Sequence, residues 1–571
     1  MLHPEFDKLT ESGERDFLHT GRIIPLYPST DTLTKVGLDS RGFRRVLKIA
    51  VKDFTKHFQE TLPKEIVARQ NLTDLKNAIK HVHFPENKKW LAAARKRLKF
   101  DELFYLELML AYRKRNMEVH RKGIEFLKVG KRTKTLIESL PFELTDAQKK
   151  VIREIRTDMK KSIPMNRLLQ GDVGSGKTVV ALISILMSIE NGYQAALMAP
   201  TEILADQHYV TMRKLLKELG IEVALLVGAQ KKNERKEILK CIKEGKTQIV
   251  VGTHALIQEG VEFDRLGLVI IDEQHRFGVM QRATLMEKGL TPDVLVMTAT
   301  PIPRTLSMTL YGDLDVSVID ELPPGRKPVK TVWRSDTRRS EVYKYVKSKV
   351  DEGAQVYIVF PLIEESEKVD LQAAIDNYEK LQSGLFSNKT VGLLHGRLKS
   401  DEKERIMGEF KSGKIQILVS TTVIEVGVDA PNATIMIIEN AERFGLPQLH
   451  QLRGRVGRGE KKSYCFLIAQ YPLSAEAKVR LNTMTETTDG FKIAEVDLKL
   501  RGPGEFFGTK QHGLPKLRIA DIVKDTELLI KARNEAFDFA RKNKKLNFEN
   551  APMRTHFFKN YREKFELARI G

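Results

Sequence analysis

Runs of consecutive apolar residues recur through the middle of the chain and alternate with amphipathic stretches. Between about residues 131 and 322, the apolar runs cover 195–199, 248–252, 266–271 and 294–297. In a strand with one solvent-exposed face, apolar and polar residues alternate. These runs lack that alternation, so they predict strands that are buried on both faces. Buried strands that alternate with helices are typical of a parallel sheet covered by helices.

A second series of the same kind follows a break in the pattern. Residues 322–326 (Leu-Pro-Pro-Gly-Arg) interrupt the alternation and are the best candidate for a linker. Beyond them, apolar runs recur at 355–360, 390–394, 415–420, 433–438 and 464–468. The sequence therefore predicts an α/β protein with two parallel-sheet domains in tandem, which share an architecture rather than a repeated sequence.

Helical spacing dominates on either side of these two series. From about residue 34 to residue 130, apolar residues recur three and four positions apart, as in Leu91, Ala94 and Leu98. After about residue 471 the chain is again predicted to be helical, with a glycine-rich interruption from 501 to 513. The first 35 residues are predicted to form a strand or loop fragment that is too short to bury a core alone.

The balance of charge points to a polyanionic partner. The 571 residues contain 96 Lys and Arg against 75 Asp and Glu, which gives a formal net charge of +21. Because phosphate contacts dominate nucleic-acid affinity, a nucleic acid is the natural partner for such a chain. A generally basic proteome is the alternative source of the same excess.

Cysteine content and hydropathy exclude several classes of protein. The two cysteines, Cys241 and Cys465, are too few for a disulfide framework or a Cys-based zinc site, and they suggest a reducing compartment. The start of the chain lacks the pattern of a signal peptide. The longest apolar run, 179–189, is too short to span a bilayer. We therefore expect a soluble intracellular protein without membrane contact.

One glycine-rich turn between a short apolar strand and a helix matches a phosphate-binding loop. Residues 171–178 fit the pattern G-x-x-x-x-G-K-[ST]. Gly171, Gly174 and Gly176 let backbone amides turn inward toward phosphate oxygens, and the following helix adds its N-terminal dipole. Lys177 is expected to contact the β- and γ-phosphates of ATP, and Thr178 to hold Mg²⁺.

Two adjacent acids at the end of a later aliphatic strand complete an ATPase pattern. Asp272 lies 95 positions after Lys177 (272 minus 177) and directly follows Val-Ile-Ile. We expect Asp272 to hold Mg²⁺ through water, and Glu273 to take a proton from the attacking water.

These residues also carry a resemblance to a known family. Residues 272–275 (Asp-Glu-Gln-His) resemble the DExH box of superfamily-two helicases, which implies two RecA-like domains. Further segments resemble the other motifs of that family, in the family's order. They imply adenine recognition by Phe142 and Gln148, nucleotide binding by Gly427 and Asp429, nucleic-acid backbone contacts by Thr201, Thr253 and His254, coupling by Thr298 and Thr300, and catalysis by Gln451, Arg455 and Arg458.

Two of these residues have a physical reason to lie in the second domain. Arg455 and Arg458 follow the predicted linker, so they come from the second domain. Arginines that reach a γ-phosphate across a cleft stabilise transition-state charge, which is worth about 10³–10⁵ in rate. They also make closure of the two domains depend on ATP.

Longer segments narrow the resemblance to the RecG family of bacterial branched-DNA helicases. These segments are 272–279, 300–306 and 361–367, followed by 484–494 and 497–513 after the motor. The last two resemble the translocation motif shared by that family and the transcription-repair coupling factors, a helical hairpin followed by a loop. Within that motif, the resemblance implies that Arg501 and Gln511 grip DNA or relay movement.

The resemblance covers nearly the whole chain and implies five parts. They are a remnant of an OB-type wedge domain (1–35), a helical linking region (36–130), a first RecA-like domain (131–324), a second RecA-like domain (325–472) and a C-terminal translocation hairpin with its tail (473–571). Family members carry a full wedge domain that splits the fork. Here only its exit is present, so the chain is a fragment, begins at an internal start site, or is a shortened version.

The resemblance implies an ATP-driven helicase and double-stranded DNA translocase that remodels stalled replication forks and Holliday junctions in repair and recombination. Its expected cofactors are ATP and Mg²⁺. Its expected partners are branched double-stranded DNA and single-strand-binding protein. The resemblance further implies a monomer in the bacterial cytoplasm, associated with the nucleoid.

Three alternatives to this function remain. The first is a coupling-factor-like translocase that acts on stalled RNA polymerase, but the 130 residues before the motor are too few for the modules it needs. The second is a DExH-type RNA helicase, which RNA-stimulated ATPase would reveal. The third is a nucleic-acid-binding protein with a silent ATPase, against which the intact ATPase residues argue.

Overall fold

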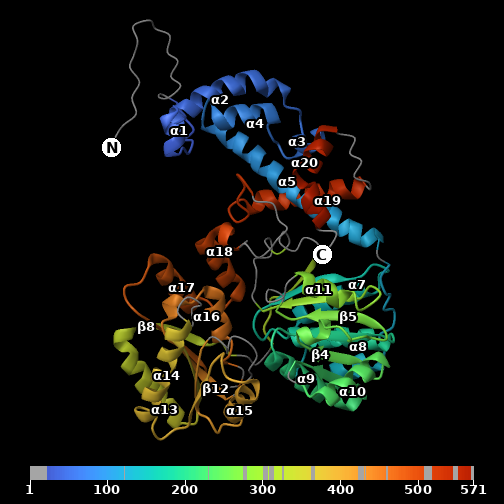
Figure 1. Cartoon of the computed structure of the whole chain (residues 1–571), viewed down its shortest axis with the longest axis vertical. Coiled ribbons are helices and arrows are strands. Elements are labelled where there is room, and N and C mark those ends of the chain that lie inside the picture. Colours follow the sequence, from blue (N-terminus) through green and yellow to red (C-terminus); the bar gives the residue numbers. More distant parts are fainter. Residues whose placement is uncertain are drawn as a thin grey trace. The chain divides into compact units, whose positions relative to one another are not determined.

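The computed structural model describes residues 22–567 except for short segments. The segments outside the description are 121, 229, 274–278, 300–306, 308–313, 324–326, 362–366, 422–429, 431, 458, 460, 507–516 and 544–550. The chain divides into two compact units (Figure 1). One is built from both ends of the chain, Met1–Asn116 with Pro503–Ile570, and the other from Met117–Gly502.

The larger unit begins with a lobe built on a seven-stranded sheet, in which every pairing is parallel. The strands are β1 (Asn166–Gly171), β2 (Gln194–Met198), β3 (Val223–Leu226), β4 (Ile249–Gly252), β5 (Leu266–Ile271), β6 (Asp293–Thr298) and β7 (Asp315–Ile319), in the order β3-β4-β2-β5-β6-β1-β7. The helices are α6 (Lys131–Ser139), α7 (Asp146–Met159), α8 (Lys177–Glu190), α9 (Glu202–Leu216), α10 (Lys232–Lys243) and α11 (Val279–Met286).

The same unit contains a second lobe on a six-stranded parallel sheet of order β10-β11-β9-β12-β13-β8. Its strands are β8 (Lys330–Ser335), β9 (Gln355–Val359), β10 (Val391–Leu394), β11 (Ile417–Ser420), β12 (Ala433–Ile438) and β13 (Tyr464–Ala469). Its helices are α13 (Arg339–Asp351), α14 (Glu367–Ser383), α15 (Ser400–Lys411) and α16 (Leu446–Arg453), followed by α17 (Ala475–Glu486) and α18 (Gly490–Phe506).

The two sheets confirm the predicted fold class. Hydrophobic clusters cover both faces of the first sheet, because Leu169 belongs to the cluster on one face and Leu168 to the cluster on the other. The strands β3 and β7 have no counterpart among the predicted apolar runs. They lie at the two edges of the sheet, where side chains are only partly buried. Apolar and polar residues alternate in β7 (Asp-Val-Ser-Val-Ile), whereas β3 (Val-Ala-Leu-Leu) is wholly apolar and was not singled out.

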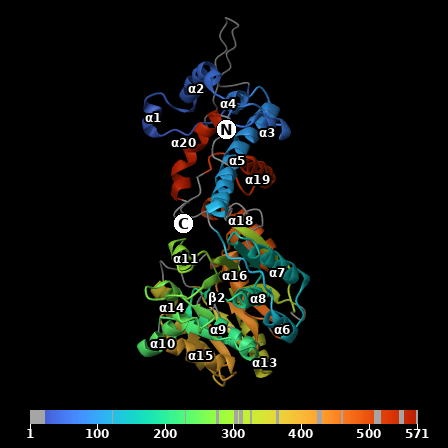
Figure 2. The ribbon, with the colours of Figure 1, turned by 90° about the vertical axis from the view of Figure 1, so that its right-hand side faces the viewer.

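The smaller unit is helical and joins segments that the sequence analysis placed in separate domains. Its helices are α1 (Asp31–Lys35), α2 (Ser40–Phe54), α3 (Lys64–Arg69), α4 (Leu75–His83), α5 (Lys88–His120), α19 (Thr526–Lys542) and α20 (Ala551–Leu567). Figure 2 shows α5 with α20 on one side and α19 on the other. No described helix of the chain has the length and apolar character needed to cross a membrane.

Ion pairs and aromatic contacts hold the two ends of the chain together in this unit. Arg533 on α19 lies 2.8 Å from Glu107 on α5, whose side chain is fully buried. Arg69 and Glu535 form a second pair at 2.7 Å. Phe104 packs edge-on against Phe539. The pair with Glu107 is costly to break, because removing Arg533 would leave a buried charge without its partner, whereas Arg69 is itself 55% exposed.

Asp293 is the first residue of β6 and is fully buried. Its carboxyl group links the start of β6 to the residue before β1. Its Oδ1 accepts a hydrogen bond from the amide of Met165 at 2.8 Å. Among the described residues, Oδ2 has no hydrogen-bond partner. Burial raises the pKa of Asp293 to about 8, against the effect of the Met165 amide and with that of the negative Asp158.

We expect the free energy of unfolding to fall as pH rises between the pKa of Asp293 in the unfolded chain and its pKa in the folded chain. The unfolded group titrates near pH ~4. The folded group titrates at about 8, so between these values the folded chain holds one more proton. The free energy of unfolding then falls by roughly 1 kcal/mol per pH unit.

Urea denaturation of the wild type and Asp293→Asn at about pH 5.5 and about pH 7.5 measures this contribution. The variant should gain stability relative to the wild type at the higher pH. An equal difference at both values contradicts the assignment.

Candidate nucleotide site

The predicted phosphate-binding loop connects β1 to α8 in the geometry that its glycines allow. Gly174 and Gly176 adopt the left-handed backbone, with φ of 76° and 87°. The side chain of Lys177 is folded against the loop, where its Nζ donates to the carbonyls of Gly171 at 2.8 Å and Asp172 at 2.9 Å. A loop that already gathers a lysine at its carbonyl groups and opens onto a helix N-terminus is suited to hold phosphates.

Gln148 braces this loop from α7. Its Nε2 donates to the carbonyl of Ser175 at 2.8 Å, and its Oε1 accepts from the amide of Thr145 at 2.9 Å in a capping box. The residue is buried, whereas Phe142 before it is 38% exposed. Adenine recognition by Phe142 and Gln148 stays a prediction, and the described role of Gln148 is to fix the shape of the loop.

The two predicted catalytic acids follow β5, which is separated from the loop strand β1 by β6. The amide of Glu273 donates to Oδ1 of Asp272 at 3.0 Å. Oδ2 of Asp272 lies 2.8 Å from Nε2 of His208. Glu273 has a φ of 52°, an uncommon backbone for a residue with a side chain, and strain of this kind clusters at functional sites.

The electrostatics of the two acids are opposite. Burial alone would raise the pKa of Asp272, but the hydrogen bond and charge of His208, together with Lys177, hold that pKa below its ordinary value. Burial and the neighbouring Asp272 raise the pKa of Glu273 to about 7, while Lys177, the amide of Ala299 and Arg455 lower it. Asp272 is therefore held in its charged form, and the pKa of Glu273 lies near neutral pH. A metal ligand beside a general base requires this combination.

The charge of Arg455 lowers the pKa of Glu273, so this predicted arginine of the second lobe is near enough to that acid to influence it. A second contact joins the lobes directly. Nε2 of His450 on α16 lies 2.5 Å from Oδ1 of Asp172 in the phosphate loop. The amide of Gly490 at the start of α18 donates to Oδ2 of the same acid at 3.2 Å. Burial raises the pKa of Asp172, but the hydrogen bond and charge of His450, together with the amide of Val173 and the charge of Lys177, lower that pKa below its ordinary value.

Helix α16 is held at its carboxyl end by the C-terminal extension, the part of the chain that begins with α17 and α18. Arg453 donates through Nη1 to the carbonyls of Met484 at 3.0 Å and Thr487 at 2.8 Å, at the end of α17. Its Nη2 lies 2.8 Å from Nδ1 of His450 and donates to the carbonyl of Thr488 at 3.2 Å. The phosphate loop, α16 and the turn before α18 therefore form one continuous hydrogen-bonded chain.

The amino end of α16 is held by α18. Asp497 on α18 lies near the amide of Leu446, the first residue of α16. Burial raises the pKa of Asp497, and this amide acts against that rise. Arg501, one of the predicted coupling residues, donates from Nε to Oδ1 of Asp497 at 3.1 Å. A Cβ on Gly445 would lie 2.3 Å from Nη2 of Arg501, so the guanidinium occupies the space that this glycine leaves open.

The predicted nucleic-acid residues of the first lobe share the edge where its parallel strands end. Thr201 follows β2 and caps α9, where its Oγ1 accepts from the amide of Leu204 at 3.3 Å. Thr253 and His254 follow β4, and Thr298 ends β6. Thr300, Gly427, Asp429, Arg458 and Gln511 lie outside the described residues. Gln451 is buried on α16.

Four residues of the site were not singled out by the sequence analysis. His208 and Asp172 look like ordinary helix and loop residues in sequence, and no spacing rule pairs them with Asp272 or His450. Arg453 and His450 lie in the segment 448–458, which also contains the predicted Gln451, Arg455 and Arg458. Only the packing of the lobes shows which members of that segment face the phosphate loop.

The donor set fits a magnesium ion held together with a nucleotide. No cluster of three or more His, Cys, Asp or Glu side chains suited to a metal occurs within the described segments. Mg²⁺ in phosphate-transfer sites needs only one or two protein oxygens, because phosphates and water complete its shell. Asp272 is held charged, and Thr178 follows the lysine of the loop, so these two are the residues that would hold the ion.

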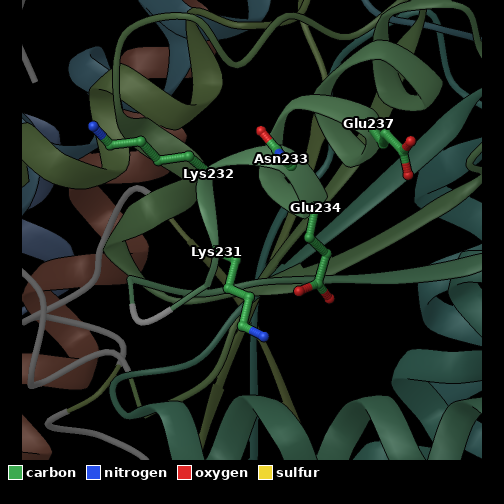
Figure 3. A pocket seen from close by; sticks show the side chains of 5 residues that line it. All are labelled: Lys231, Lys232, Asn233, Glu234 and Glu237. Carbon is green, nitrogen blue, oxygen red and sulfur yellow. The ribbon is translucent and has the colours of Figure 1, made fainter.

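A separate open pocket lies at the start of α10 (Figure 3). It is lined by Lys231, Lys232, Asn233, Glu234 and Glu237. None of these residues belongs to the predicted nucleotide site. The mixed charges on one exposed helix end are those of a solvated surface rather than of a binding site.

Three family models match successive parts of the chain. DEAD/DEAH box helicase matches residues 145–309, and the helicase conserved C-terminal domain matches residues 338–460. The model described as ATP-dependent DNA helicase RecG, domain 3, C-terminal, matches residues 487–565. The matches follow the order first lobe, second lobe and C-terminal extension.

Curated relatives and a solved structure agree with the family models. The chain is 51% identical to ATP-dependent DNA helicase RecG of Synechocystis sp. over 94% of its own length and 64% of that protein. It is 51% identical to the Thermotoga maritima protein of that name over 90% and 65%, and 50% identical to the Streptococcus pneumoniae one over 88% and 74%. A structure of RecG bound to a three-way DNA junction is 48% identical, with a TM-score of 0.69, and the match covers 89% of this chain and 66% of that one.

The glycines at the two ends of α8 provide a matched test of the phosphate loop. Gly176 and Gly192 have nearly the same φ, 87° and 84°. A Cβ at Gly176 would lie 2.2 Å from Nε2 of Gln148, whereas a Cβ at Gly192 meets nothing within 4 Å. Both alanine variants therefore carry the same left-handed strain, on the order of 1–2 kcal/mol, and only Gly176→Ala displaces Gln148.

We expect Gly176→Ala to weaken binding of a fluorescent ATP analogue about tenfold or more, or about 1.4 kcal/mol. Gly192→Ala should bind the analogue as the wild type does. Equal weakening in both variants would show that backbone strain, rather than the contact with Gln148, decides the effect.

Proposed function

Because this chain belongs to the RecG family of ATP-dependent DNA helicases, we propose that it is an ATP-driven motor that moves on double-stranded DNA and remodels branched DNA. The chain spans about two thirds of the length of the first two relatives, 64% and 65%. The observation that carries the proposal is the contact of α16 with the phosphate loop through His450 and Asp172, while α17 and α18 hold both ends of that helix. A motor needs such a path from its nucleotide to its moving part.

The site supports a division of labour in hydrolysis. In this proposal, Lys177 contacts the β- and γ-phosphates, and Thr178 and Asp272 hold Mg²⁺, which neutralises charge on the phosphates. Glu273 accepts the proton of the attacking water, for which a pKa of about 7 is well matched. Arg455 stabilises charge from the second lobe, and Gln451 and Arg458 are assigned to the same step by their motif.

The C-terminal extension supports coupling of hydrolysis to movement. Arg453 and Asp497 hold opposite ends of α16, so rotation of that helix moves α17 and α18 with it. His450 connects the same helix to the phosphate loop. The movement of the lobes as they close around ATP would therefore be transmitted to Arg501 through a single short helix, rather than through a long flexible connection.

Branched DNA is the proposed partner. The solved relative is a RecG bound to a three-way DNA junction, and the net charge of +21 suits a phosphate backbone. Thr201, Thr253, His254 and Thr298 supply hydroxyl and imidazole groups at one sheet edge, which suit backbone contacts without base reading. Because the relatives are bacterial, the proposal extends to a monomer in the bacterial cytoplasm that works beside single-strand-binding protein.

ATP hydrolysis measured with five nucleic acids tests the proposal. Four-way and forked DNA should stimulate turnover most, linear duplex less, and single-stranded DNA and RNA least. Preferential stimulation by RNA would favour the DExH RNA helicase instead. An absence of stimulation by all five would favour a binding protein with a silent ATPase.

Glu273→Gln should separate nucleotide binding from turnover. The amide keeps the size of the side chain but cannot accept a proton from water, so turnover should fall about 10²–10⁴-fold. Binding of a fluorescent ATP analogue should stay near that of the wild type. Turnover within a few fold of the wild type would reject Glu273 as the base.

Arg501→Ala should uncouple turnover from unwinding, because it removes the guanidinium at the start of α16 without touching the nucleotide loop. DNA-stimulated ATPase should be largely retained, while unwinding of a branched substrate drops. Gly445→Ala should act in the same direction, since its Cβ pushes Nη2 of Arg501 away. Gly408→Ala on α15 is the matched control, because its Cβ meets nothing within 4 Å. A proportional loss of both activities in Arg501→Ala contradicts the coupling role.

A further inference from the structure

His208 fixes the acid that the proposed function assigns to Mg²⁺. Its Nε2 lies 2.8 Å from Oδ2 of Asp272, and the two side chains are only 7% and 12% exposed. A carboxylate accepts and cannot donate, so Nε2 of His208 is the donor. The amide of Glu273 donates to the other oxygen, Oδ1, at 3.0 Å. The carboxylate of Asp272 is therefore held from two directions, and the contact with His208 comes from another secondary structure element.

The helix that carries His208 also contacts the parts of the molecule that a motor moves. Its N-cap is Thr201, one of the residues predicted to contact a nucleic-acid backbone. In its first turn, Oε1 of Glu202 accepts from the amide of Gly228 at 3.0 Å. Ile203 packs against the hydrophobic core of the second lobe.

His208 lies seven positions after the cap, which is two turns or about 10 Å along a rigid helix. The 15 residues of α9 contain no glycine or proline at which the helix would bend. A shift at the N-terminal end of α9 is therefore carried to His208 and from there to the carboxylate of Asp272.

We propose that His208 is a positioning residue for hydrolysis, which sets the orientation of Asp272 toward Mg²⁺ and links that orientation to the position of α9. The inference rests on the proposed function, because ATP, Mg²⁺ and nucleic-acid contact belong to it. Residues that hydrogen-bond a metal ligand from behind orient it, and their loss typically costs about 10–100-fold in metal affinity or activity. By this route, nucleic acid bound at Thr201 or closure of the second lobe onto Ile203 would shift α9 and thereby change the orientation of Asp272. The phosphate loop takes no part in this route.

Two amide substitutions at this position form a matched pair. The amide nitrogen of glutamine reaches about as far from the backbone as Nε2 of histidine, whereas that of asparagine reaches only as far as Nδ1. His208→Gln should therefore preserve the hydrogen bond to Asp272, and His208→Asn should lose it. Val210→Ala, on the same helix at a position 49% exposed, controls for general effects on α9.

Equilibrium binding of a fluorescent ATP analogue at increasing Mg²⁺ is the first measurement. The Mg²⁺ concentration for half-maximal binding should rise about tenfold or more in His208→Asn. It should stay within about threefold of the wild type in His208→Gln and Val210→Ala, since both keep the bond to Asp272. An unchanged value in His208→Asn overturns the proposal, and so does an equal rise in His208→Gln when both variants melt at the temperature of the wild type.

Stimulation of turnover by duplex DNA is the second measurement, and it addresses the link to α9. In His208→Asn the kcat reached with saturating DNA should fall by a larger factor than the KM for ATP changes. A wild-type chain that no nucleic acid stimulates would reject the proposed function, while the Mg²⁺ titration would still decide the role of His208.

A double substitution keeps the test decisive if His208→Asn melts early. In an Asp272→Asn background, which removes the charged ligand, adding His208→Asn should cause little further change in the Mg²⁺ requirement. Full additivity of the two changes would show that the residues act independently and would overturn the proposal.

Discussion

Two buried carboxylates at the edge of the first sheet, Asp172 and Asp272, must each be compensated, because a charge taken out of water is strongly destabilising when it stays unpaired. Each is met by a histidine from another element, His450 and His208 respectively. The requirement to compensate these charges therefore joins the phosphate loop to the second lobe and the DExH acid to α9. In both cases the compensation of a local charge connects separate parts of the molecule.

Parallel topology explains why residues far apart in sequence gather at this edge. Every strand of the first sheet ends on the same side, so Gly171, Thr201, Thr253, Asp272 and Thr298 all follow carboxyl ends of neighbouring strands. Ligand sites of open parallel sheets form at such edges. The second sheet repeats the arrangement, and α16 follows its strand β12 by way of a short turn. In the proposed function both edges would face one nucleotide, so the completeness of the site would depend on how the lobes approach each other.

Helix α16 is short, and this property makes it effective as a connection. Its eight residues are held by Asp497 at one end and by Arg453 at the other, so it cannot tilt without moving α17 and α18. His450 on the same helix contacts the phosphate loop. A longer or less constrained helix would absorb a displacement by bending, whereas this one transmits it. In the separate helical unit, the buried pair of Glu107 and Arg533 plays a comparable structural part by joining the two ends of the chain.

The sequence by itself determined the fold class and the two tandem sheets, and it predicted the residue types of the proposed nucleotide site. Those features depend on local pattern: continuous apolar runs, a glycine-rich turn at Gly174 and Gly176, and acids directly after a strand. The edge strand β7 escaped prediction because its residues alternate between apolar and polar, whereas β3 is wholly apolar and was not singled out. Only the tertiary structure decided that Asp272 pairs with His208 and Asp172 with His450, and that helices from both ends of the chain form one unit. Such pairings depend on which surfaces meet in space, and residues separated by tens or hundreds of positions leave no periodic trace of their contact.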